Sequence, residues 1–273
     1  MSESDDPFAA AARELQQRRA THEEVRSSKR HVDADLHLRR LIQDFAVALR
    51  ASWVAFTRYP NSDLWLLQRS TDDLLESVIA VPTLTSNGMV NVARRELRYL
   101  LEATVKYVYV DQQLDGDAPL EERVRYLGDP SKVPRSSITT IDDTKIWMLD
   151  EPEQLRHAVK QSFGALSGDV HPSRTAVKER LARAERGEFV GFEGPRVLEA
   201  FNGLMSQTLD VVLALIFQGI GPSFTGDLFI QIFDDLPDWK FHRTRFVAQI
   251  SRHFDYKVER QDRCPSPAES PID

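Results

Sequence analysis

The sequence predicts an all-α fold, a multi-helix bundle of about seven to nine helices with a long internal loop. Apolar residues recur every three or four positions over most of the chain, the spacing that places them on one face of a helix. Turn-forming Pro, Gly, Asn and Asp residues separate these periodic stretches. With 273 residues, of which 41% are apolar, the chain is also long enough to bury a sizeable core.

We expect a single helical domain over residues 8–260. The acidic N-terminus, residues 1–7, and the Pro- and Ser-rich tail, residues 261–273, are predicted to be disordered, because neither can bury apolar surface. The domain divides into an N-terminal arm, a bundle core and a C-terminal aromatic and basic helical segment, at residues 8–32, 33–220 and 221–260.

The arm is rich in Ala, Gln, Arg and Glu and holds few large apolar residues, which is typical either of a solvated helix or of an arm that docks on a partner. A second helix is predicted to begin near Asp33 or Asp35, since both suit an N-cap or a first turn. It runs towards Tyr59. A third helix follows the turn at residues 60–63, and Pro82 is expected to end or kink it.

The fourth helix has the clearest periodicity, from Val90 to Val110. One face of this predicted helix is apolar and carries Val90, Leu97, Leu101, Thr104 and Val108. A second face is polar and carries Asn91, Arg95, Arg98, Glu102 and Lys106.

The remaining elements follow from proline and glycine positions. Residues 128–150 form a long connection with one short element, of the length that is usually functional or mobile. Pro152 opens a helix to Leu166, and a short charged helix ends at Arg186. A long apolar helix begins at Pro195, which suits a first helical turn, and ends at Gly219 and Gly221. The last stretch, residues 224–257, is aromatic and changes from acidic to basic.

Composition excludes several classes of protein. A net charge of −7 argues against a general nucleic-acid coat protein. The lone Cys264 excludes an intramolecular disulfide and a Cys-based zinc site. The acidic N-terminus lacks the apolar region of a signal peptide, and the longest apolar stretch, Leu209–Ile220, is too short to cross a bilayer. We therefore expect a soluble, cytoplasmic protein without a membrane partner.

No motif indicates a cofactor. The chain contains no P-loop sequence, no glycine-rich dinucleotide fingerprint after a strand and no zinc-protease helix motif. The alternation of His31, Asp33, Asp35 and His37 resembles a cation site, but acidic residues near a helix start are better explained by capping. We expect no metal and no cofactor.

His171 lies in a turn, residues 166–173, where Gly168 and Pro172 limit the backbone. A neutral imidazole there can act as a general acid or base. The alternative is a structural turn whose imidazole bonds a neighbouring carbonyl. Ser167, Asp169 and His171 are too close in sequence for a hydrolase relay, and no nucleophile-elbow motif is present.

The polar face of the fourth helix has two interpretations. Arg98 and Glu102, like Glu102 and Lys106, are four residues apart and suit ion pairs on a solvated face. Alternatively the face lines a cleft in which Arg95 and Arg98 bind phosphate and Glu102 orients a base.

The C-terminal segment combines cations with aromatic residues. Four of its basic residues are candidates for binding nucleic acid, at Lys240, Arg243, Arg245 and Arg252. Trp239, Phe241, Phe246, Phe254 and Tyr256 lie between or beside them, a mixture that can hold single strands through phosphates and stacking. An amphipathic helix that docks on the bundle has the same composition.

Two stretches together resemble bacterial HEPN-like helical proteins: residues 94–102, Arg-Arg-Glu-Leu-Arg-Tyr-Leu-Leu-Glu, and residues 166–173, Leu-Ser-Gly-Asp-Val-His-Pro-Ser. The resemblance covers residues 60–220. It implies a helical bundle, often dimeric, whose active members are metal-independent RNases of toxin–antitoxin and phage-defence systems. Their signature places a His a few residues after an Arg, whereas here the nearest upstream Arg to His171 is Arg156.

Two functions are therefore expected as alternatives. The first is a HEPN-like defence or toxin protein that acts on RNA or nucleotides. In that case His171 is the acid or base for attack by the ribose 2′-hydroxyl, and Arg95 or Arg98 supplies the phosphate-binding charge. The second is a non-catalytic scaffold or sensor that forms a homodimer and binds a protein partner such as an antitoxin.

Overall fold

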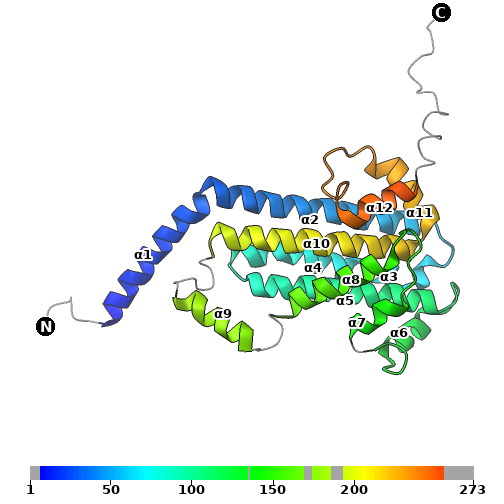
Figure 1. The fold of residues 1–273 in the computed structure, drawn as a ribbon, viewed down its shortest axis with the longest axis horizontal. Helices are drawn as coiled ribbons and strands as arrows, with labels where there is room; N and C mark the ends of the chain where they lie inside the picture. The colour runs from blue at the N-terminus through cyan, green and yellow to red at the C-terminus, as the bar shows by residue number, and fades with distance from the viewer. Residues whose placement is uncertain (1–6, 135, 169–173, 186–192, 255–273) are drawn as a thin grey trace, which may run out of the picture.

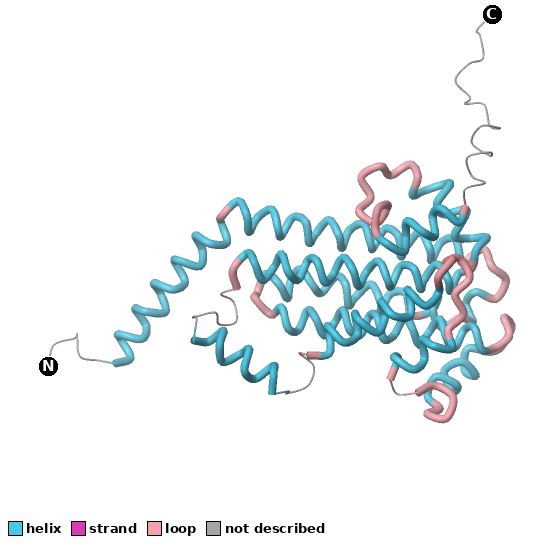
Figure 2. The backbone as a smooth tube through the Cα atoms, viewed as in Figure 1, coloured by secondary structure: helices cyan, strands magenta, loops and turns pink. Residues whose placement is uncertain are grey.

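The computed structural model describes residues 7–134, 136–168, 174–185 and 193–254. Of this part 79% is helical, and none of the described residues forms a strand (Figure 2). The predicted all-α fold is confirmed.

Twelve α-helical segments occur in the described part of the chain, and two of them, α3 and α7, are single turns of four residues. The ten longer helices exceed the seven to nine predicted. One cause is α6, a helix of nine residues that is too short to show a clear apolar period in the sequence. The helices are α1 (Pro7–Ser27), α2 (Lys29–Phe56), α3 (Leu66–Arg69), α4 (Thr71–Ser86), α5 (Val90–Gln113), α6 (Leu120–Gly128), α7 (Ser137–Thr140), α8 (Pro152–Ser167), α9 (Arg174–Glu185), α10 (Pro195–Ile220), α11 (Pro222–Leu228) and α12 (Arg245–His253).

Helix α10 is the centre of the bundle. It packs against α2, α5, α8 and α12, while α4 packs against α5 and α2 (Figure 1). Among the described helices it alone is long and apolar enough to cross a membrane, and most of its side chains are buried among the surrounding helices, as in a core helix. It ends where Gly221 takes a φ of 86°, in the left-handed region that suits glycine.

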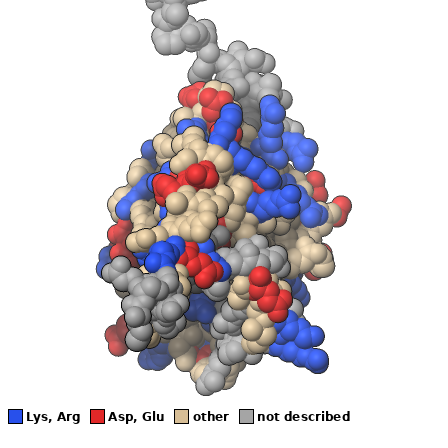
Figure 3. Space-filling model, turned by 90° about the vertical axis from the view of Figure 1, so that its left-hand side faces the viewer, with Lys and Arg blue, Asp and Glu red and all other residues tan. Residues whose placement is uncertain are grey.

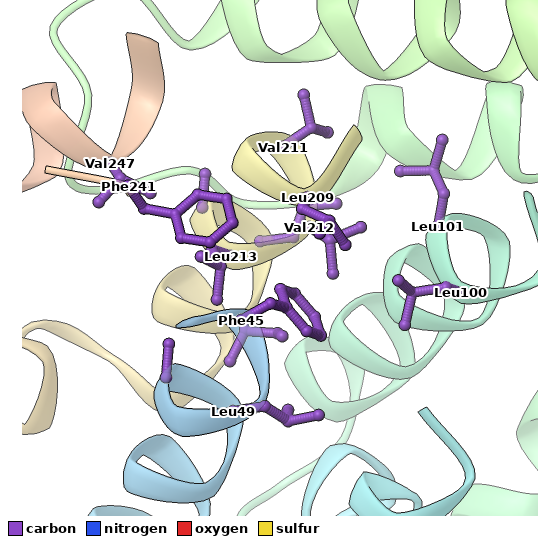
Figure 4. Packing of buried hydrophobic residues seen from close by; sticks show 14 of the residues in the cluster. Phe45, Leu49, Leu100, Leu101, Leu209, Val211, Val212, Leu213, Phe241 and Val247 are labelled. Carbon is purple, nitrogen blue, oxygen red and sulfur yellow. The ribbon is translucent and has the colours of Figure 1, made fainter. Parts of the chain in front are cut away.

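The core is formed by side chains from α2, α5 and α10, closed on one side by residues of the C-terminal segment (Figure 4). The apolar face predicted for the fourth helix is confirmed, because all five of its members are buried in α5. Core residues labelled in the close view are Phe45, Leu49, Leu100, Leu101, Leu209, Val211, Val212, Leu213, Phe241 and Val247.

Two predicted helix boundaries differ from the structure: the start near Asp33 or Asp35 is wrong, and so is the end at Pro82, which was one of the two alternatives for that residue. The second helix begins at Lys29, with Ser28 as its N-cap: the Ser28 hydroxyl accepts a hydrogen bond from the His31 backbone N–H, so Asp33 and Asp35 lie inside the helix. Helix α4 continues through Pro82 to Ser86. Pro82 lacks the N–H that would bond the Val78 carbonyl and its ring crowds that carbonyl, but it lies in the last turns of the helix, where one lost backbone bond does not end it.

Two buried aspartates hold short elements against the long helices. Asp111 of α5 accepts hydrogen bonds from the backbone N–H groups of Leu66 and Leu67, at 3.0 and 2.9 Å, and lies 3.2 Å from Arg123 Nη1. Arg123 of α6 is itself fully buried. Burial raises the pKa of Asp111 to about 6, against the opposing effect of these donors.

Asp210 of α10 holds α12 against the long helices in the same way. Its carboxylate accepts backbone hydrogen bonds from Phe246 and Val247, both at 3.0 Å, and so caps the start of that helix. Burial raises the pKa of Asp210 as well. The C-terminal segment is thereby fixed to the core.

Candidate functional site

Arg98 joins the polar face of α5 to the end of α8. Its Nη1 donates a hydrogen bond to the Ser167 hydroxyl at 2.9 Å, and its guanidinium lies 4.3 Å from the centre of the Phe163 ring. Its Nε is 3.7 Å from a carboxylate oxygen of Glu102. These contacts leave the Arg98 side chain only 15% exposed, so it holds α8 against α5.

The predicted ion pairs of α5 are present, but they lie on a half-buried face and not on the solvated face that was expected, since the three side chains are only 15–26% exposed. Glu102 lies between Arg98 and Lys106, with Lys106 Nζ at 3.3 Å from its other carboxylate oxygen. Arg95 is on the same helix but faces solvent. The structure thus brings together Arg98 and Glu102 of the four predicted catalytic residues.

His171 and Asp169 lie outside the described residues. Ser167, the hydrogen-bond partner of Arg98, is four residues before His171 in the sequence. The role of His171 and its distance from Arg95 and Arg98 therefore stay predictions.

The C-terminal basic residues are exposed, but the aromatic residues beside them are not available for stacking on bases. Lys240, Arg243, Arg245 and Arg252 all face solvent, and Arg245 donates a hydrogen bond to Gln154 Oε1 at 2.6 Å. The four described aromatic side chains are at most 4% exposed and belong to the core, namely Trp239, Phe241, Phe246 and Phe254. For these four the stacking interpretation is wrong, and the docking alternative holds. Tyr256 lies outside the described residues.

The alternating His and Asp residues of α2 do not converge. Asp33 pairs with Lys29 at 2.5 Å and Asp35 with Arg39 at 2.7 Å, each along the helix. Within the described ranges, no group of three or more His, Cys, Asp or Glu side chains is arranged to hold a metal ion.

A small cavity lies where α1 and α2 meet the α4–α5 turn and the start of α10. Its lining includes His22, Arg26, His31 and Glu193, and its volume of about 20 Å³ is enough for one water molecule and too small for a substrate. The Nδ1 atom of His31 is buried there without a hydrogen-bond partner. Burial, and then the charge of Arg26, lower the pKa of His31.

A larger hollow lies on the outer side of α2, beside the loop that precedes α12. We call it the α2 groove. It has a volume of about 330 Å³, and its walls include Arg40, Asp44, Val47, Leu236, Pro237 and Asp238. Asp44 holds the two walls together, because its carboxylate accepts a hydrogen bond from the Lys240 backbone N–H at 2.8 Å and its carbonyl accepts one from Trp239 Nε1 at 3.0 Å. Along α2 the same carboxylate pairs with Arg40 at 3.0 Å. Val47 and Leu236 remain 41% and 37% exposed.

The arm predicted over residues 8–32 ends earlier, because residues 29–32 belong to α2. From here on we call helix α1 the arm; it leaves the bundle at Ser28 and extends away from it (Figure 1). None of its described side chains is buried. Phe8 and Leu15 are 84% and 45% exposed. Seen from the end where the arm protrudes, the surface carries Lys and Arg side chains in groups among Asp and Glu rather than as one continuous basic area (Figure 3).

Sequence reasoning did not identify the α2 groove, or Ser167 and Phe163 as the partners of Arg98. The groove depends on a loop distant in sequence from α2, and the partners depend on how α8 packs on α5. One signal was available for Asp210, since a single acidic residue in a long apolar stretch indicates a buried carboxylate with a structural partner.

Comparison with protein family models, with curated proteins and with solved structures finds no match for this chain.

Proposed function

We propose that this chain is a non-catalytic helical scaffold or sensor that binds a protein partner through its arm. The observation that carries the proposal is the contrast between the arm and its own bundle: none of its described side chains is buried. Residues 10–21 are all exposed, and the contacts at the other end are few, such as His22 Nε2 at 3.4 Å from the Glu193 carbonyl oxygen. A helix held by so few contacts is marginally stable in water, even when it is rich in alanine.

The arm also presents the residues that a partner would need. Phe8 and Leu15 are seven residues apart, so they lie on one face two turns from each other. Exposed apolar residues at this spacing are a common mode of helix recognition in a partner's groove. The polar face of α5 supports the same proposal, because Arg98 is engaged by Ser167, Phe163 and Glu102.

A photo-crosslinking amino acid placed at position 15 in the producing cell tests this proposal. We expect one discrete protein adduct from position 15. The matched control is position 124, where Val124 of α6 is 54% exposed on another surface. The same adducts from both positions, or none from position 15, would contradict the proposal.

A second candidate function, an RNA-acting protein of HEPN-like defence or toxin type, is favoured by one contact. The hydrogen bond from Arg98 to Ser167 joins the arginine-bearing helix to the residue that leads into the His171 turn. In this candidate His171 would serve as acid or base, with Arg95 near the phosphate, while the exposed C-terminal cations would contact the RNA backbone.

Cellular RNA integrity after brief induction separates the two candidates. The wild type is compared with His171→Ala and with a control, His157→Ala, which removes an exposed histidine of α8. The scaffold proposal expects intact tRNA and rRNA in all three. Cleavage by the wild type and by His157→Ala, but not by His171→Ala, would instead establish the RNA-acting function.

A further inference from the structure

The α2 groove and the arm each leave large apolar side chains exposed, Val47 and Leu236 in the groove and Phe8 and Leu15 in the arm. We propose that the α2 groove binds the arm of a second copy of this chain. The inference rests on the proposed function, in which the arm is the binding element, and it names the partner as a like chain.

Spacing is the first argument. Val47 in the groove and Val54, which is 52% exposed, lie seven residues apart on the outer face of α2. Leu15 and Phe8 of the arm have the same separation, about 10.5 Å along a helix axis. An arm that lies antiparallel to α2 therefore brings Leu15 against Val47 while Phe8 lies over Val54.

Charge is the second argument, and it favours the same antiparallel arrangement of the arm on α2. Arg18 and Arg19 follow Leu15 by three and four residues, so they flank it on the helix face. In the antiparallel arrangement they lie towards the Asp44 end of the groove, where Asp238 forms part of the wall. Asp235, in the same loop, is exposed. Arg18 is itself paired with Glu14 at 2.7 Å, and Arg40 on the α2 wall is paired with Asp44, so the charge argument rests on Arg19 facing the acidic loop.

The chain's own arm does not fill its own groove. The arm and α2 are separated only by Ser28, whose φ of −61° and ψ of 142° belong to extended backbone. Two helices that fold back antiparallel need a loop of about two to five residues. The occupant must therefore come from another molecule, and a reciprocal exchange of arms closes a dimer with two equal contacts.

The test is a set of charge substitutions with mass measured by light scattering after size-exclusion chromatography. Leu15→Glu disables the arm, Val47→Glu disables the groove, and Val124→Glu places the same charge on α6 as a control. Leu236→Glu, on the opposite wall of the groove, replaces Val47→Glu if that variant does not fold. Far-UV circular dichroism checks the folding of every variant.

We expect the wild type and Val124→Glu to have the mass of two 31.2 kDa chains, and each of the other variants to have the mass of one. An equimolar mixture of Leu15→Glu and Val47→Glu should recover the two-chain mass in part, because one intact arm meets one intact groove. A direct contact between two α2 helices would instead leave Leu15→Glu at the mass of two chains.

A wild type with the mass of one chain, variants that keep the mass of two, or a mixture that stays at one would each overturn the inference. A different result would refute the proposed function. An adduct from position 15 to a different protein, with a one-chain mass for the wild type, would refute the exchange of arms and leave the scaffold proposal standing. The absence of any adduct from position 15 would refute both.

Discussion

The bundle and the arm are both helical, yet they are held by different interactions. In the bundle, α10 has most of its side chains buried, and buried carboxylates fix α3 and α12 to the long helices. In the arm, 21 residues form a helix of which no described side chain is buried. Removing a contact should therefore matter greatly in the bundle and very little in the arm.

This difference teaches that helical structure and packing have separate causes in this chain. The arm is rich in Ala, Gln, Glu and Arg, which favour helix by local propensity alone. The bundle helices contain many residues of lower propensity and depend on burial, as the valines of α5 show. A segment selected for local propensity and left without a core is suited to binding elsewhere.

The largest effect is expected at the buried ion pair. Arg123→Met leaves the Asp111 carboxylate buried without its cation, and we expect a loss of about 3–5 kcal/mol in the free energy of unfolding. Arg125→Met, on the exposed side of the same helix, serves as the control and should change it by less than about 0.5 kcal/mol. Urea denaturation measures both, and equal effects would show that the pair does not support the fold.

The comparison of bundle and arm can be made with a single type of substitution. Leu101→Ala removes a fully buried side chain of α5 and should cost about 2–5 kcal/mol. Leu15→Ala in the arm should cost less than about 0.5 kcal/mol in dilute solution. Chemical denaturation of both variants checks this, and a near-zero loss for Leu101→Ala would overturn the orientation of α5.

A smaller effect should appear as a pH dependence. The pKa of Asp111 is raised by burial to about 6, so the folded state holds this proton more tightly than the unfolded chain does. Its contribution to stability is therefore complete in acid and is lost as the pH rises through 6. Between pH 5 and pH 7 we expect a fall of about 1 kcal/mol in the wild type.

Asp111→Asn should lack this fall, although one of the two backbone N–H groups then loses its acceptor and the variant is less stable at every pH. Denaturation of both proteins at pH 5 and pH 7 isolates the effect. The same change with pH in both proteins would assign it to other groups.

The fold class, the α5 faces and the arm could be predicted because each depends on local patterns. Leu97, Leu101 and Val108 repeat at helical spacing, and the lack of large apolar residues near the N-terminus predicted a segment outside the core, either a solvated helix or a docking arm. Ser28 and Pro82 were misjudged because an N-cap and a tolerated proline depend on where the surrounding backbone bonds end.

The candidate site could be predicted only in part. The spacing of Arg98, Glu102 and Lys106 was enough to predict their ion pairs. The burial of Trp239 and Phe241 was not predictable from composition, because the same residues suit a stacking surface and a docked segment. The α2 groove joins α2 to a loop about 190 residues later, a long-range contact that periodicity does not reveal.

The central claim is that the arm is ordered by a partner and not by its own bundle. Amide hydrogen exchange on Leu15→Glu, compared with the wild type, tests it most directly. We predict that α5 and α10 exchange slowly in both proteins, and that α1 exchanges fast in Leu15→Glu but is protected in the wild type. Protection of α1 in Leu15→Glu as strong as that of α5 would contradict the claim.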